Sequence, residues 1–266
     1  MAANTTLQPF VLHIPHAHHE IPDAYRSDFL LSDDELAYEM RIMADHGTDS
    51  LFLPLEKPAE CVTSPWSRLF VDMERFRDDH DEDMSQLGMG VLYEKTASGK
   101  PMRHPPTPAI REKILRDYYD THHNRLTKAV DARLEHFGWC LIIDCHSFPK
   151  ESLPYEDANW KRPEICLGCD DFHTPQVLRD LYRHAFESGG FDVAINEPFK
   201  GSLVPLKHYR KDPRVLSIML EARRDLYITE NNFPEVIYEA FVAHKIRERA
   251  SSALDGALAY YGKAHL

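Results

Sequence analysis

Short apolar runs alternate with longer amphipathic segments along the chain. The clearest run is residues 139–145, Trp-Cys-Leu-Ile-Ile-Asp-Cys, and shorter runs occupy residues 10–14, 164–168 and 215–220. Continuous apolar runs of this length are typical of strands that are buried on both faces of a sheet. Residues 68–73 are also rich in apolar and strand-favouring side chains, so we expect another strand there.

Helical spacing marks most of the segments between these runs. Ser32 and Glu35 have the spacing of a capping box, and apolar residues follow at helical intervals, which predicts a helix that reaches about Asp49. Thr107-Pro108 suits a helix N-terminus, and an apolar stripe continues from there until Gly138. We expect further helices from 174–175 to 189–190 and from about 234 to 261.

The alternation of predicted strands and helices indicates an α/β fold. We expect three layers, with a mixed central sheet covered by helices on both faces. Residues 77–107 are charged, contain Gly and Pro and show little periodicity, so they are expected to form a long loop or lid. Nothing in the chain has the composition of a linker, and residues 1–266 are therefore predicted to form a single catalytic domain.

Charge and composition exclude several classes of partner. The formal net charge is −12, which argues against non-specific binding to nucleic acid or to an anionic membrane. The apolar runs are far shorter than the roughly 20 residues of a membrane span, and no signal peptide is visible at the N-terminus. The five cysteines are scattered, and the lone pair Cys166 and Cys169 has no second pair to complete a zinc site. We therefore expect reduced thiols and a cytoplasmic protein that acts on a small molecule.

Ionisable residues follow three of the predicted strands. His16 comes just after the first strand, Asp144 and His146 close the 139–145 run, and Glu221 follows the 215–220 run. Sites in open α/β sheets gather at the carboxyl ends of the central strands. One such residue is ordinarily a hydrogen-bonded structural group, but three strands that end in this way predict a common site.

Two histidines and a carboxylate are ligands that suit a catalytic Zn²⁺ ion, which keeps one position for water. A separate glutamate is then needed to accept and return a proton. A serine nucleophile is a weaker interpretation, because Ser147 lacks a G-x-S-x-G setting.

Six segments together resemble the N-formylglutamate amidohydrolase family. Each match is short, but all six keep the order of the family's motifs and together span about residues 11–228. The segments are Pro15-His16-Ala17 through Pro22, Asp72-Met73-Glu74-Arg75, His123 with Leu126, Ile143-Asp144-Cys145-His146-Ser147, Phe199-Lys200-Gly201 through Pro205, and Met219-Leu220-Glu221 with Leu226-Tyr227.

The resemblance implies a fold related to zinc carboxypeptidases and aspartoacylases, and a zinc-dependent amidohydrolase. By that implication His16 and His146 are zinc ligands and Glu221 is the catalytic acid and base. Arg75 would bind a substrate carboxylate through its planar guanidinium. The corresponding substrate-binding set is completed by His123, Gly201 and Arg224.

The third zinc ligand stays open between three residues. Zinc carboxypeptidases use an H-x-x-E motif, whereas His19 stands three residues after His16 and Glu20 follows it. The resembled family has an aspartate at the place of Asp45, and this favours Asp45 as the ligand.

One departure from the family concerns the substrate. Glu74 stands where the family has asparagine, and its carboxylate would either pair with Arg75 or repel a dianionic substrate. The expected reaction is hydrolysis of an N-formyl or N-acyl amino acid, and formylglutamate would give formate and glutamate. The alternatives are a metallocarboxypeptidase-like enzyme that acts on short peptides and an inactive relative that binds a metabolite.

Overall fold

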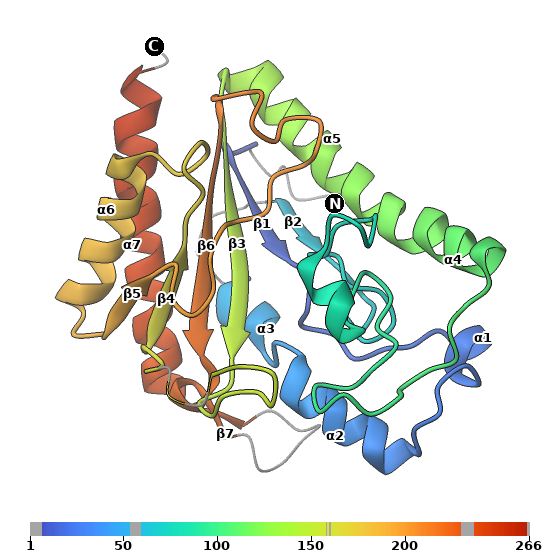
Figure 1. Ribbon diagram of the computed structural model, residues 1–266. Helices are drawn as coiled ribbons and strands as arrows, with labels where there is room; N and C mark the ends of the chain where they lie inside the picture. The colour runs from blue at the N-terminus through green and yellow to red at the C-terminus, as the bar shows by residue number, and fades with distance from the viewer. Residues whose placement is uncertain (1–6, 54–59, 158, 160, 230–236, 265–266) are drawn as a thin grey trace, which may run out of the picture.

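The computed structural model describes residues 7–53, 60–157, 159, 161–229 and 237–264 (Figure 1). Six strands form one mixed sheet in the order β2-β1-β3-β6-β4-β5. The first four in this order are parallel, β4 runs antiparallel to β6, and β5 is parallel to β4. Their bounds are β1 Phe10–Ile14, β2 Glu60–Thr63, β3 Cys140–Phe148, β4 Ile165–Gly168, β5 Val193–Ile195 and β6 Val215–Arg223.

Helices cover both faces of this sheet. In Figure 1, α5 follows one face, and α6 and α7 lie side by side against the other. A π-helical turn, Leu115–Tyr119, joins α4 to α5, and β7 and β8 form a separate antiparallel pair. The three-layer prediction is therefore confirmed. The remaining bounds are α1 Asp23–Arg26, α2 Asp33–Met43, α3 Thr48–Phe52, α4 Pro108–Ile114, α5 Asp120–Phe137, α6 Gln176–Ser188, α7 Ala240–Ala264, β7 Ile228–Thr229 and β8 Ile237–Tyr238.

The side chains of β3 point alternately to the two faces of the sheet, and each set packs into a different apolar cluster. Leu141 and Ile143 belong to the apolar cluster that includes α6 and α7, whereas Ile142 belongs to a cluster with Leu126 of α5. Because successive side chains of a strand point to opposite faces, Asp144 and His146 lie on the α5 face. The pattern that builds the core therefore also places polar groups on one side of the sheet.

The prediction of a strand at Arg68–Met73 is wrong. The amides of Phe70 and Val71 bond to the carbonyl of Ser67, at 2.9 and 3.2 Å, so the chain turns there. Buried Arg103 donates to the carbonyls of Leu69 and Phe70, which replaces the bonds that a neighbouring strand would make. The apolar residues are buried as expected, but in a turn.

The helix that was predicted to reach Asp49 ends at Met43. Its capping box at Ser32 and Glu35 is present, but Ala44 adopts an extended conformation with φ −80° and ψ 157°. The amide of Asp45 then bonds to the carbonyl of His16 at 3.0 Å. A tertiary contact therefore ends the helix and turns Asp45 toward the sheet.

Residues 77–107 form the expected loop, with one 3₁₀ turn at Asp83–Leu87. Several of its apolar side chains are nevertheless buried, among them Met89, Val91 and Tyr93. They pack with apolar residues of α2 and α4, so this loop forms part of the hydrophobic core.

The C-terminal helix begins at Ala240, because Ile237–Tyr238 pairs with β7 instead. Residues 234–236 of the predicted helix lie outside the described residues. None of the helices in the described ranges is both long and apolar enough to cross a membrane. All five cysteines are free thiols, as expected.

Gly168, at the end of β4, provides a test of the packing beneath the site. A Cβ atom there would lie 2.2 Å from the carbonyl oxygen of Gly201 and 2.4 Å from Met219 Cε. Gly168→Ala should therefore destabilise the fold by about 1–3 kcal/mol through overpacking, measured by chemical or thermal unfolding. Gly262→Ala is the matched control, because a Cβ in that helix meets nothing within 4 Å. If the two variants unfold alike, Gly168 does not set this contact.

Candidate active site

The carboxyl ends of β1, β3 and β6 meet at one edge of the sheet, because the three strands are neighbours and parallel. In their register His13 stands opposite Asp144, and His146 stands opposite Glu221. His16 follows β1 by two residues, and its ring centroid lies 5.2 Å from that of His146. The predicted convergence of three strand ends is therefore observed.

His16, Asp45 and His146 form a compact buried group. Their potential ligand atoms all lie within 4.8 Å of one another. Asp45 Oδ2 is 2.9 Å from His146 Nδ1 and 3.7 Å from His16 Nδ1. This arrangement brings two imidazole nitrogens and one carboxylate together, although Asp45 comes from a different part of the chain.

A second carboxylate orients each histidine of this group. His16 Nε2 lies 2.8 Å from Asp72 Oδ1, and His146 Nε2 lies 3.1 Å from Asp144 Oδ1. Both Nδ1 atoms therefore turn toward Asp45. Such outer carboxylates fix the ring orientation and the tautomer of histidines that bind metals.

The donor set fits a zinc ion. Imidazole nitrogen and carboxylate oxygen are among the ligands that zinc prefers. His16 Nδ1 is buried and makes no hydrogen bond among the described residues, although buried polar atoms are normally paired. A cation between His16, Asp45 and His146 would use this nitrogen and satisfy it.

The other two candidates for the third ligand lie apart from this group. His19 Nε2 is 2.6 Å from His46 Nδ1, and the two rings stack with centroids 4.6 Å apart. Glu20 is exposed and forms an isolated bridge with Trp66. The geometry therefore favours Asp45.

Asp72 is the most heavily bonded carboxylate of the site. In addition to His16, it accepts from Arg68 Nε and Nη2 at 3.1 and 2.9 Å, from the Tyr93 hydroxyl at 2.7 Å and from the Glu74 amide at 2.9 Å. Burial favours its neutral form, but Arg68 and His16 outweigh burial and hold the pKa of Asp72 well below its usual range.

Burial and neighbouring charged groups also act in opposite directions on the ionisation of Asp45 and His146. Burial opposes ionisation of both groups, yet the hydrogen bond from His146 and the nearby charge of His16 lower the pKa of Asp45. Burial likewise opposes the charged form of His146, but Asp144 and Asp45 raise the pKa of His146 well above its usual value. The site therefore concentrates negative charge that needs a cation or protonated histidines as partners.

Glu221 lies beside this group on the neighbouring strand. Its side chain is buried, and Oε2 makes no hydrogen bond among the described residues. Burial raises the pKa of Glu221 to about 8, although the charge of His146 opposes the rise. Arg223 donates to Asp225 at 2.7 Å, so at least this strand-end arginine is engaged elsewhere.

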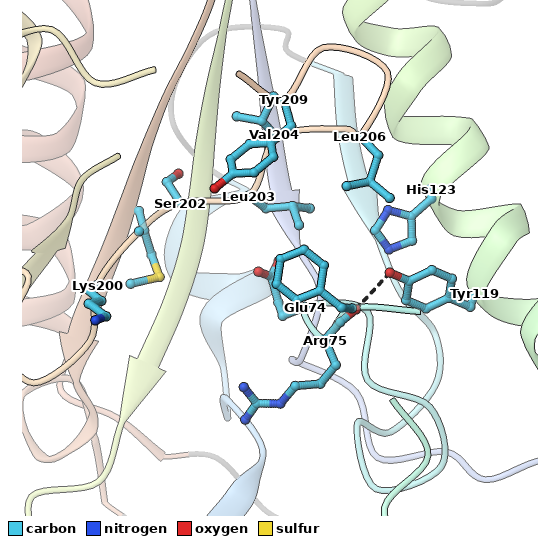
Figure 2. Close-up of a pocket in the computed structure, with 13 residues that line it drawn as sticks. Glu74, Arg75, Tyr119, His123, Lys200, Ser202, Leu203, Val204, Leu206 and Tyr209 are labelled. Atoms are coloured by element: carbon cyan, nitrogen blue, oxygen red, sulfur yellow. Dashed lines mark hydrogen bonds between the residues drawn. The ribbon is translucent and has the colours of Figure 1, made fainter. Parts of the chain in front are cut away.

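A pocket of about 220 Å³ opens beside the site, between α5, the turn at Glu74 and the 200–209 loop (Figure 2). Three of the four residues predicted to bind substrate line it, namely Arg75, His123 and Gly201. Figure 2 shows His123 and Tyr119 on the helical side and Lys200 on the opposite side. The lining combines charged groups with apolar side chains such as Leu203 and Met219.

Two residues from the helical side hold the turn that carries Glu74 and Arg75. Tyr119 donates from its hydroxyl to the carbonyl of Arg75 at 2.8 Å, and His123 Nε2 lies 3.0 Å from the carbonyl of Met73. Burial lowers the pKa of His123 to about 4, so it is a neutral donor. His123 therefore positions the turn as well as lining the pocket.

Arg75 and Arg224 differ in how their guanidinium groups are used. Arg75 lies 3.8 Å from Asp72 and 3.6 Å from Glu82, and its buried Nε makes no hydrogen bond among the described residues. Arg224 instead donates to the carbonyls of Arg41, Ile42 and Ala44 at the end of α2. The structure thus places Arg224 at a helix C-terminus, away from the pocket.

His13 is a residue of the site that the sequence reasoning missed. It is fully buried within β1, with Nδ1 2.8 Å from Asp144 Oδ1 and 3.2 Å from Glu74 Oε1, and Nε2 2.8 Å from His122 Nε2. Burial opposes its charge, but Asp144 and Glu74 raise the pKa of His13 to about 9. A histidine inside an otherwise apolar strand run was the available signal.

Comparison with known proteins places these observations in a family. The family model for N-formylglutamate amidohydrolase matches residues 8–228. An N-formylglutamate deformylase from Pseudomonas putida is 26% identical over 237 residues, which cover 84% of this chain and 82% of the relative.

Solved structures agree with this placement at the level of the fold. The N-formylglutamate amidohydrolase of Ralstonia eutropha JMP134 aligns with a TM-score of 0.80 and 21% identity, over 96% of this chain and 95% of that one. A gene product of Agrobacterium tumefaciens aligns with a TM-score of 0.64 and 19% identity, over 96% and 90%. With its six motifs in order and a family match over most of its length, the chain belongs to the N-formylglutamate amidohydrolase family.

Proposed function

We propose that residues 1–266 form one zinc-dependent catalytic domain that hydrolyses the amide bond of an N-formyl amino acid. N-formylglutamate is the lead substrate and would give formate and glutamate. The observation that carries this proposal is the buried group of His16, Asp45 and His146 beside Glu221 and a charged pocket. The name of the Pseudomonas putida relative, a deformylase of N-formylglutamate, supports the same substrate.

His16, Asp45 and His146 would hold the zinc ion. A bound zinc ion would polarise the amide carbonyl and make water a stronger nucleophile. Asp72 and Asp144 keep the two imidazoles turned inward, so the ligand atoms need little rearrangement.

Glu221 is proposed as the group that moves the proton. It accepts a proton from the attacking water and later delivers it to the departing amine. Its position beside His146 in the strand register supports this assignment, as does its buried Oε2, which makes no hydrogen bond within the described ranges.

Arg75 is proposed to bind the substrate carboxylate. It lines the pocket, and its Nε is buried without a hydrogen bond among the described residues. A guanidinium with an unused donor suits the two oxygens of a carboxylate. The pocket volume of about 220 Å³ is sufficient for a single N-acyl amino acid.

The metal assignment can be tested by metal analysis after dialysis. His16→Ala should lose one zinc ion per chain relative to the wild type, and hydrolysis of N-formylglutamate should be lost with it. His18→Ala is the matched control, because that neighbouring histidine lies outside the buried group. Full zinc content and activity in His16→Ala would refute the proposed ligand set.

The role of Arg75 predicts a change in substrate affinity. Arg75→Lys keeps the charge but loses the planar fork, so KM for a carboxylate-bearing substrate should rise by about 10–100-fold, corresponding to about 1–3 kcal/mol. Arg77→Lys is a suitable control, because Arg77 bonds to Glu112 and Asp120 near the surface. An unchanged KM in steady-state assays of Arg75→Lys would remove Arg75 from the binding site.

The role of Glu221 predicts a loss of turnover without a loss of stability. Glu221→Gln keeps the size of the side chain but cannot accept the proton, so kcat should fall about 10²–10⁴-fold. Zinc content and melting temperature should stay near those of the wild type. Exposed Glu135 supplies the control substitution Glu135→Gln. A lowered melting temperature with kcat preserved would instead show that Glu221 is structural.

A further inference from the structure

A second group of buried ligand atoms lies directly beside the first. His13 Nδ1, Glu74 Oε1 and Asp144 Oδ1 all lie within 4.8 Å of one another. His13 and Asp144 are fully buried, and Glu74 lines the pocket. From this group we infer a second divalent-cation site, held by His13, Glu74 and Asp144.

One proton cannot satisfy these three groups. If His13 donates from Nδ1 to Asp144 Oδ1 at 2.8 Å, Glu74 Oε1 stays 3.2 Å from the same nitrogen. Glu74 Oε1 is buried and has no hydrogen bond among the described residues. The shared ion pair with His13 leaves Glu74 Oε1 without a hydrogen bond of its own, whereas a cation between the three atoms would contact all of them.

The ring of His13 is oriented in the same way as that of His16. His13 Nε2 is held by His122 at 2.8 Å, and His16 Nε2 is held by Asp72 at 2.8 Å. In both residues an outer partner fixes one nitrogen, and Nδ1 faces a carboxylate. This is the arrangement of a metal-binding histidine with its outer partner.

His146 lies between the two groups and presents one nitrogen to each. Nδ1 faces Asp45, whereas Nε2 lies 3.1 Å from Asp144 Oδ1 and 3.8 Å from Glu74 Oε1. His146 therefore connects the two groups through its hydrogen bond to Asp144. In the second group, an imidazole nitrogen with two carboxylates suits Zn²⁺, Co²⁺ or Mn²⁺.

A second cation would also explain how a carboxylate at position 74 can serve a carboxylate-binding pocket. An unneutralised Glu74 would repel an anionic substrate at short range. A divalent cation bound to Glu74 and Asp144 would neutralise both carboxylates and so remove this repulsion. Only this consequence rests on the proposed function, since the site itself depends on the ligand geometry alone.

Metal counting tests the second site. Protein loaded with Co²⁺ or Zn²⁺ and then dialysed should hold two ions per chain, measured by mass spectrometry of the metal. Glu74→Gln and Glu74→Asn should hold one, and the Co²⁺ absorption spectrum should lose one component. Glu135→Gln should keep both ions. A wild-type count that Glu74→Gln leaves unchanged would overturn the proposal.

His16→Ala separates the two sites, because His16 contributes only to the first group. If His16→Ala keeps its metal content while Glu74→Gln loses an ion, the proposed hydrolytic centre fails and the second site stands. Anomalous diffraction from metal-soaked wild-type crystals needs no variant and therefore does not depend on variant folding. It should show a peak among His13, Glu74 and Asp144, and no peak there would refute the site.

Discussion

The constraint on which the site depends is the burial of negative charge at one edge of the sheet. Asp45, Asp72 and Asp144 are each at most 3% exposed, and a buried carboxylate is tolerated only with positive or hydrogen-bonding partners. Arg68 pairs with Asp72. His16 lies beside Asp72 and Asp45, and His146 lies beside Asp45 and Asp144. The two histidines are therefore held by the charges that they neutralise, and their rings face inward for the same reason.

Two of the three buried carboxylates, Asp45 and Asp72, lie outside regular helices and strands. The α2 helix stops at Met43 and the chain extends at Ala44, which lets Asp45 face the histidines. The carbonyls left open by this early end are satisfied by buried Arg224. Asp72 likewise lies on a turn whose carbonyls are bonded by Arg103. Two buried arginines, Arg103 and Arg224, thus donate to backbone carbonyls that would otherwise accept hydrogen bonds within a helix or a sheet.

Local sequence patterns predicted the residues of the site that lie at the carboxyl ends of β3 and β6. His146 and Glu221 follow clear apolar runs, and parallel neighbours must bring their carboxyl ends together, so their proximity could be foreseen. Two of their neighbours, Asp72 in a turn and His13 inside β1, could not be foreseen in the same way. Asp72 was assigned to a strand, and His13 was counted as core, because their contacts with His16 and Asp144 join residues 56 and 131 positions apart. Local patterning contains no information about such contacts.

The long separations in sequence also connect the site with the fold as a whole. His146 and Asp45 are 101 residues apart, so the unfolded chain contains no preformed group of ligands. A cation that binds only the folded arrangement must add its binding free energy to the stability of the fold. Without a cation, the same arrangement relies on protonated imidazoles beside carboxylates. Catalytic geometry and folding stability therefore share one set of buried charges, and a substitution that alters these charges should be expected to affect both.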